Sequence, residues 1–116
     1  MNPLTAAPFA NTPEPPYYAV IFTSKRTSQE NDYGETASQM AGLAISMPGY
    51  LGMESAREAD GVGITVSYWA SEADIARWKQ QVDHLAAQDA GKTRWYEHYE
   101  LRVAKVERAY SGPEGR

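Results

Sequence analysis

The chain contains no cysteine among its 116 residues. This absence excludes disulfide bonds, thiolate nucleophiles, cysteine-ligated zinc and iron–sulfur clusters. Histidine is scarce, with two residues, and the net charge at pH 7 is −4. A chain with that charge shows no sign of the basic surface that phosphate backbones require, so we expect no nucleic-acid partner. We also expect no resident metal ion, because no spacing of ligand residues supports a metal site.

The stretch at 1–16 has neither a basic start nor a continuous apolar run, so it is not typical of a signal peptide or a membrane span. We therefore expect a cytoplasmic protein with no membrane partner. Five of the seven prolines fall in this stretch, and proline cannot donate a backbone hydrogen bond to a sheet. We expect 1–16 to be a flexible, proline-rich arm, 17–110 one folded domain and 111–116 a tail.

Hydrophobic periodicity divides the domain into strands and helices. Residues 17–24 are rich in aromatic and β-branched side chains and apolar on both faces, which is typical of a central strand. Asp60-Gly61 is a preferred hairpin-turn dipeptide. The predicted elements, in chain order, are a strand at 17–24, a helix at 29–47, strands at 50–58 and 62–69, a helix capped by Ser71 and ended by Gly91, and a strand at 94–110.

Side-chain spacing orients two of these elements. In the strand at 62–69, the neighbours Tyr68 and Trp69 must point to opposite faces of the sheet. In the helix after Ser71, apolar residues recur at spacings of three and four, which places them on one buried stripe. The members of that stripe are Ile75, Trp78, Val82 and Leu85.

The order strand, helix, strand, strand, helix, strand predicts an α+β fold of the ferredoxin-like βαββαβ type, with a four-stranded antiparallel sheet. Its two helices cover one face, and the other face needs a cover because it also carries large apolar groups. The last predicted strand is about 16 residues or 50 Å long, so we expect it to reach onto a second subunit in a face-to-face homodimer. A change of parity between Val103 and Ala104 predicts a bulge.

Three stretches resemble the antibiotic biosynthesis monooxygenase (ABM) family of dimeric α/β barrels: MPGYLGMESAR, GITVSYWASEADIARWKQ and HLAAQDAGKTRWYEHYELRVAKVER. The resemblance covers residues 17–110, without the proline-rich arm. It implies the ferredoxin-like fold and the homodimer. The family includes cofactor-independent oxygenases of polycyclic phenols, haem-degrading enzymes and members of unknown role, so the fold alone does not define the activity.

The resemblance makes haem one alternative ligand. Family members that degrade haem carry an axial histidine in the second helix, which His84 matches by position, and a tryptophan, which Trp69 or Trp78 matches. They also carry an asparagine on the first strand, and the strand at 17–24 has none. This difference disfavours haem binding.

Both histidines also have predicted roles that do not involve haem. His84 is a candidate general base, because the usual pKa of imidazole lies near operating pH, or a helix residue that contacts backbone or water. His98 has the opposite parity to Tyr99 and is expected on the other face of the sheet. Two histidines and a carboxylate can hold iron, but no further spacing supports such a site here.

Aromatic residues give the stronger signal, since indoles and phenols combine a large apolar ring with a polar tip. We expect them to gather where the third strand ends, the second helix passes and the last strand begins, either as core and dimer seam or as the wall of a pocket for a flat apolar ligand. The expected cluster consists of Trp69, Trp78, Trp95, Tyr96 and Tyr99. Its candidate substrate-binding residues are Trp69, Trp78, Trp95 and Tyr96.

A monooxygenase without metal or flavin needs little from the protein beyond a dry cavity, a base and a donor for the substrate anion. His84 is the candidate base, and Tyr99 the candidate group that steadies the anion, with Arg102 as a further anion-holding candidate. The function predicted is cofactor-independent oxygenation of a small aromatic or quinol-type substrate. The alternatives are a non-catalytic dimer that binds a small hydrophobic molecule, and a haem-binding or haem-degrading protein.

Overall fold

The structure is a computed structural model that describes residues 9–26, 42–88 and 96–113, with the backbone alone described at 26, 84–88, 96 and 97. Most of the helix predicted at 29–47 lies outside these ranges. Its final part lies inside them, and residues 42–46 are helical. This helical turn ends before Pro48-Gly49, as the sequence predicts.

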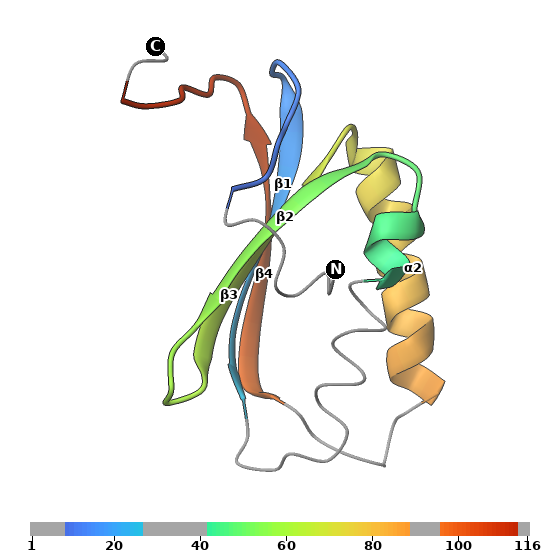
Figure 1. The fold of residues 1–116 in the computed structure, drawn as a ribbon. Helices are drawn as coiled ribbons and strands as arrows, with labels where there is room; N and C mark the ends of the chain where they lie inside the picture. Colours follow the sequence, from blue (N-terminus) through green and yellow to red (C-terminus); the bar gives the residue numbers. More distant parts are fainter. Residues whose placement is uncertain (1–8, 27–41, 89–95, 114–116) are drawn as a thin grey trace.

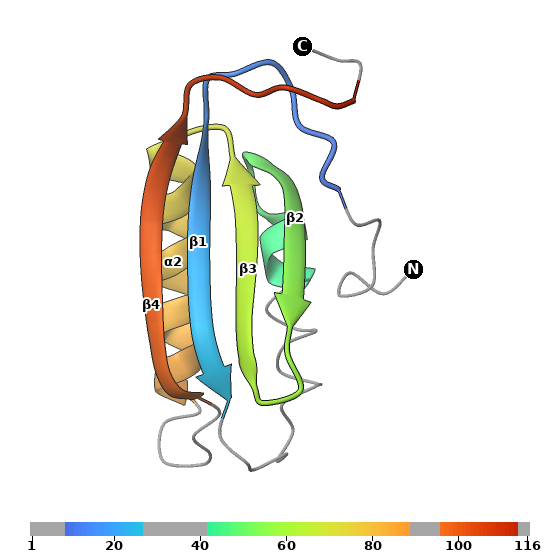
Figure 2. The same ribbon diagram turned by 90° about the vertical axis from the view of Figure 1, so that its left-hand side faces the viewer.

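Four strands form one antiparallel sheet in the order β2-β3-β1-β4 (Figure 1). Their bounds are β1 Tyr17–Arg26, β2 Tyr50–Arg57, β3 Val62–Trp69 and β4 Tyr96–Val106, and the helix α2 spans Glu72–Gln88. Figure 2 shows the face of the sheet, with the four strands side by side and β1 between β3 and β4. The predicted α+β, ferredoxin-like fold is confirmed, and so is the central position of the strand that is apolar on both faces.

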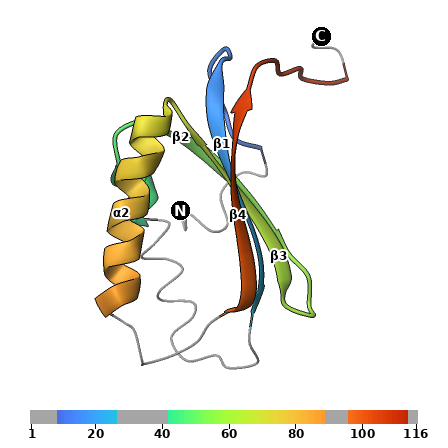
Figure 3. The same cartoon turned by 180° about the vertical axis from the view of Figure 1, so that it is seen from behind.

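The core lies between the sheet and the described helical residues, which all lie on one face of the sheet (Figure 3). Trp69 of β3 is 0% exposed and Val20 of β1 is 1% exposed. Ala44 from the helical turn and Ile75 from α2 complete this buried cluster. The cluster fixes which side of each strand faces the helices, and we call this the helix side and the opposite face the open side.

Helix α2 begins where the sequence predicts. The backbone N–H of Asp74 donates to Ser71 Oγ at 3.2 Å, and the Ser71 hydroxyl donates to Asp74 Oδ2 at 2.9 Å. The first contact satisfies one of the backbone donors that a helix start leaves unpaired, and the second holds the two side chains together. Of the predicted stripe, Ile75 is buried and Trp78 and Val82 are half-buried, whereas the Leu85 side chain and Gly91 lie outside the description.

The prediction for the last strand is wrong in length and in the place of its bulge. Strand β4 has 11 residues and ends at Val106, so no strand continues to 110 and the proposed extension onto a second subunit loses its basis. The register shift lies between Lys25 and Arg26, near the start of β4, whereas Val103 and Ala104 pair with Val20 and Ala19 in unbroken register. The change of parity arises because β4 carries apolar residues on both faces.

The segment before β1 contacts the open side of the sheet at β1 and β2. The backbone N–H of Ala10 donates to Glu54 Oε2 at 2.9 Å, and Thr12 Oγ1 lies 3.0 Å from the Tyr17 hydroxyl oxygen. The division into arm, domain and tail stays a prediction. Within the described part of the chain, no helix is both long and apolar enough to cross a membrane.

Gly49 lies between the first helical segment and β2 and packs closely against Asp74 of α2, so even a small substitution there is expected to disturb the fold. Its φ is +85°, and an added Cβ would lie 2.1 Å from Asp74 Oδ2. We expect Gly49→Ala to lower the free energy of unfolding by at least about 2 kcal/mol, because a left-handed backbone and a clash act together. Urea unfolding measures this change.

Gly42→Ala is the matched control. Nothing lies within 4 Å of a Cβ added there, and residue 42 is helical, so the change is expected to be neutral or stabilising. Equal unfolding midpoints for the two variants would contradict the role assigned to Gly49.

Candidate functional site

Two indoles stack at the end of the sheet where β3 meets α2. The ring centroids of Trp69 and Trp78 are 5.5 Å apart with an interplanar angle of 37°. Tyr50 meets Trp69 edge-on, with centroids 5.6 Å apart, and burial raises the pKa of the Tyr50 phenol. The structure thus brings together two of the predicted substrate-binding residues, on the helix side.

The two indole N–H groups differ in their partners. Trp69 Nε1 donates to Ser67 Oγ at 2.9 Å. Trp78 Nε1 is buried and has no hydrogen-bond acceptor among the described residues. A buried donor without an acceptor costs about 1–3 kcal/mol, which makes such a group exceptional in a folded protein. It is the polar atom on the helix side that a ligand oxygen would satisfy.

Tyr99 lies far from this indole pair. It pairs with Ser24 on β1, whereas Trp69 pairs with Tyr18, six residues away along the same strand. At 3.3 Å per residue this separation is about 20 Å. Both β3 and β4 run antiparallel to β1, so the end of β3 and the start of β4 lie at opposite ends of the sheet. The predicted single aromatic cluster is therefore divided into two.

The second group lies around Tyr99 and contains a residue that sequence analysis missed. Tyr99, which is 56% exposed, meets Phe22 with ring centroids 5.4 Å apart. Beside them, Arg57 Nη2 donates to Ser24 Oγ at 2.9 Å and Nη1 contacts the Gly61 carbonyl oxygen. A Cβ on Gly63 would lie 2.7 Å from Arg57 Cζ. The glycine in the strand was the signal, because it leaves room for a long side chain to cross the sheet.

The histidines are not brought together by any described contact. His98 lies on the open side, as its parity predicts, is exposed, and has Nε2 2.6 Å from Glu100 Oε2. His84 lies in α2, but its side chain is outside the description, as are Trp95 and the Tyr96 side chain. In the described ranges no three His, Cys, Asp or Glu side chains gather as metal ligands.

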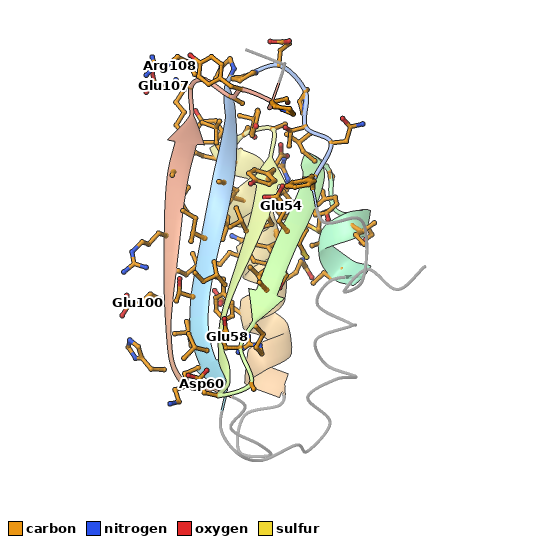
Figure 4. The ribbon with its side chains drawn as sticks, turned by 60° about the vertical axis from the view of Figure 1, so that its left-hand side comes forward. Glu54, Glu58, Asp60, Glu100, Glu107 and Arg108 are labelled. Carbon is orange, nitrogen blue, oxygen red and sulfur yellow. The ribbon has the colours of Figure 1, made fainter. Side chains whose placement is uncertain are left out.

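A third polar cluster lies on the open side, where Figure 4 labels Glu54 on β2. The Tyr68 hydroxyl donates to Glu54 Oε1 at 2.6 Å, and the ring meets Tyr17 edge-on at 5.7 Å between centroids. Burial raises the pKa of the Tyr68 phenol well above its ordinary value, and the hydrogen bond to Glu54 and its negative charge raise it further. Tyr68 and Trp69 thus face opposite sides, as predicted.

The four-stranded antiparallel sheet and the helices on one of its faces define a ferredoxin-like α+β protein. The comparisons with known proteins identify its family. The model of the antibiotic biosynthesis monooxygenase (ABM) family matches residues 16–90, and the chain belongs to this family. Uncharacterized protein YqjZ of Bacillus subtilis (strain 168) is 56% identical over 99 residues, which cover 85% of this chain and 87% of that protein.

More distant relatives share less sequence. Jasmonate monooxygenase ABM of Pyricularia oryzae is 28% identical over 92 residues, which cover 77% of this chain but 43% of that protein. Among solved structures, the cofactor-independent oxygenase SnoaB of Streptomyces nogalater superposes with a TM-score of 0.65 at 13% identity, covering 80% of this chain and 95% of that one. NE2512 of Nitrosomonas europaea, a protein of unknown function, gives a TM-score of 0.59 at 17% identity, covering 86% and 97%.

The raised pKa of Tyr68 predicts how stability depends on pH. Below the usual tyrosine pKa near 10, the phenol is neutral in both the folded and unfolded chain. Above it, the unfolded chain releases the proton and the folded chain retains it, so the free energy of unfolding falls as pH rises from about 10. We expect Tyr68→Phe to make this fall shallower, measured by urea unfolding between about pH 9 and 11.5.

Tyr110→Phe, at a ring that is 67% exposed, is the control for this experiment. Burial raises the pKa of Tyr50 as well, so part of the pH dependence remains in Tyr68→Phe. The same slope in wild type and Tyr68→Phe would show that Tyr68 is not the group responsible.

Proposed function

We propose that this ABM-family chain is a cofactor-independent monooxygenase, an oxidoreductase that acts on a small aromatic or quinol-type substrate on the helix side of its sheet. We further propose that it works as a homodimer in the cytoplasm. The observation that carries the catalytic proposal is the buried indole N–H of Trp78, which has no acceptor among the described residues. The oxygenase descriptions of two distant relatives add support.

The chemistry explains why such a donor matters. Ground-state oxygen is a triplet and reacts slowly with closed-shell molecules, so the substrate itself must supply electrons as a phenolate or enolate. When a phenol becomes a quinone, one oxygen atom enters the ring, the other leaves as water, and the substrate provides all four electrons. The protein then has to bind the flat ring, exclude water and stabilise the anionic oxygen.

The described residues match those tasks in part. The half-buried Trp78 ring, packed against the fully buried Trp69, offers an apolar surface, and its N–H is the proposed donor to a substrate oxygen. Tyr99 lies about 20 Å along the sheet from Trp69, too far to contact a small substrate bound at the indole pair, so we leave it out of the proposed site. Trp95 and Tyr96 remain proposed substrate-binding residues.

His84 remains the proposed base. It follows Trp78 by six positions in α2, which is about 9 Å along the helix toward the end where β4 starts and about 120° around its axis. The rotation around the axis is the geometric point against His84, so its role needs a direct test.

Oxygen uptake tests the role of Trp78. The purified chain, free of metal and flavin, is expected to consume oxygen with at least one member of a panel of flat phenols and quinols. Trp78→Phe keeps an aromatic side chain but removes the pyrrole part of the indole with its N–H, and loss of one such donor is expected to lower kcat about 100-fold. Lys79→Ala, next along the same helix in an exposed ion pair with Asp83, is the matched control and should retain activity.

Equal turnover by Trp78→Phe and Lys79→Ala would remove Trp78 from the mechanism. Tight binding of a panel member without oxygen uptake would favour the rival function, a non-catalytic dimer that holds a small hydrophobic molecule.

A second pair of measurements tests His84. If it is the base, His84→Ala should lower kcat by about 100-fold or more. Haemin addition separates this role from haem ligation, because a Soret shift that disappears in His84→Ala would indicate an axial ligand. Unchanged turnover in His84→Ala would remove the proposed base.

A further inference from the structure

The segment before β1 is held onto the open side of the sheet by specific contacts. Figure 2 shows it crossing the ends of the strands and descending beside β2. The Glu54 carboxylate accepts two hydrogen bonds, from the Ala10 backbone N–H at 2.9 Å and from the Tyr68 hydroxyl at 2.6 Å. Gly52 makes the close approach possible, since a Cβ there would lie 2.9 Å from Ala10 Cβ.

This anchored segment carries an exposed phenylalanine. Phe9 precedes Ala10 directly and is 82% exposed, the highest value among the large hydrophobic side chains described as exposed. An exposed apolar ring does not stabilise the single chain. Burial of the Phe9 ring against a partner would stabilise the complex by about 1.5–3 kcal/mol. Ala10 is fixed by its hydrogen bond to Glu54, so the Phe9 ring lies where a partner packed against the open side would contact it.

The open side itself has the composition of a self-complementary surface. On β3, Val62 and Ile64 point to this side and are 38% and 47% exposed. On β4, Glu100 and Arg102 occupy successive positions on the same side, and both are exposed. In a two-fold contact, residue i of one copy meets residue j of the other, and j meets i. Glu100 of each copy can therefore pair with Arg102 of the other.

We propose that the N-terminal segment is part of the interface with a second copy of this chain, and that Phe9 docks onto the open side of that copy. The inference rests on the homodimer of the proposed function and adds to it: the seam is formed by the sheet face and by two arms, each anchored through its own Glu54. Glu54, Tyr68 and Gly52, which hold the N-terminal segment on the sheet, thus contribute to dimer formation in this proposal.

Sedimentation equilibrium of the full chain tests this arrangement. We expect Phe9→Ala to raise the dimer dissociation constant at least about tenfold, the scale of a buried aromatic contact. Tyr110→Ala is the matched control, because that ring is also highly exposed, at 67%, but lies in the segment after β4. It should leave the dissociation constant unchanged. Ile64→Glu, on the sheet face itself, should dissociate the dimer.

The outcomes separate the arm from the dimer. A wild-type dimer that is weakened equally little by Phe9→Ala and Tyr110→Ala, but is dissociated by Ile64→Glu, would overturn the docking of Phe9 and leave the dimer intact. A wild-type chain that sediments as a monomer at micromolar concentration would overturn both the dimer and the arm.

Discussion

The burial of Trp69 is the constraint on which the rest of the structure depends. Its indole is fully buried where β3 ends, its N–H is satisfied by Ser67, and the rings of Tyr50 and Trp78 lie on either side of it. This packing fixes α2 against the sheet and sets which side of every strand faces the helices. It also places Trp78 with a buried N–H that has no acceptor in the described ranges. Core and proposed site are therefore contiguous.

The sheet is apolar on both sides, but the helices cover one of them. Tyr17 and Ala19 are buried on the open side, whereas Ile64 remains exposed. The difference follows the N-terminal segment, which covers the part of this side near Glu54. In the proposed dimer, the N-terminal segment covers part of the open side, and the second copy covers the region around Ile64. On this account, catalysis belongs to the helix side and assembly to the open side.

Local patterns in the sequence predicted the elements well. The alternation in β3 assigned Tyr68 and Trp69 to opposite faces, and Ser71 marked the start of α2, because these signals depend on neighbouring residues. Contacts set by register over long separations were missed. The grouping of Tyr99 with Trp69 ignored that β3 and β4 run in the same direction. The position of Arg57 depends on the space at Gly63, and the hydrogen bond from Ala10 to Glu54 depends on the space at Gly52. Neither space can be recognised until the strands are paired.

The central claim is that the Trp78 N–H is held for a substrate oxygen, and the indole region of a ¹⁵N–¹H correlation spectrum tests it most directly. The three tryptophans give three resolvable signals, which single Trp→Phe variants assign. When a flat phenol is added, the account predicts a downfield shift of the Trp78 indole proton, whereas the Trp69 proton, bonded to Ser67, keeps its position. Saturating ligand that leaves the Trp78 signal unmoved would contradict the account.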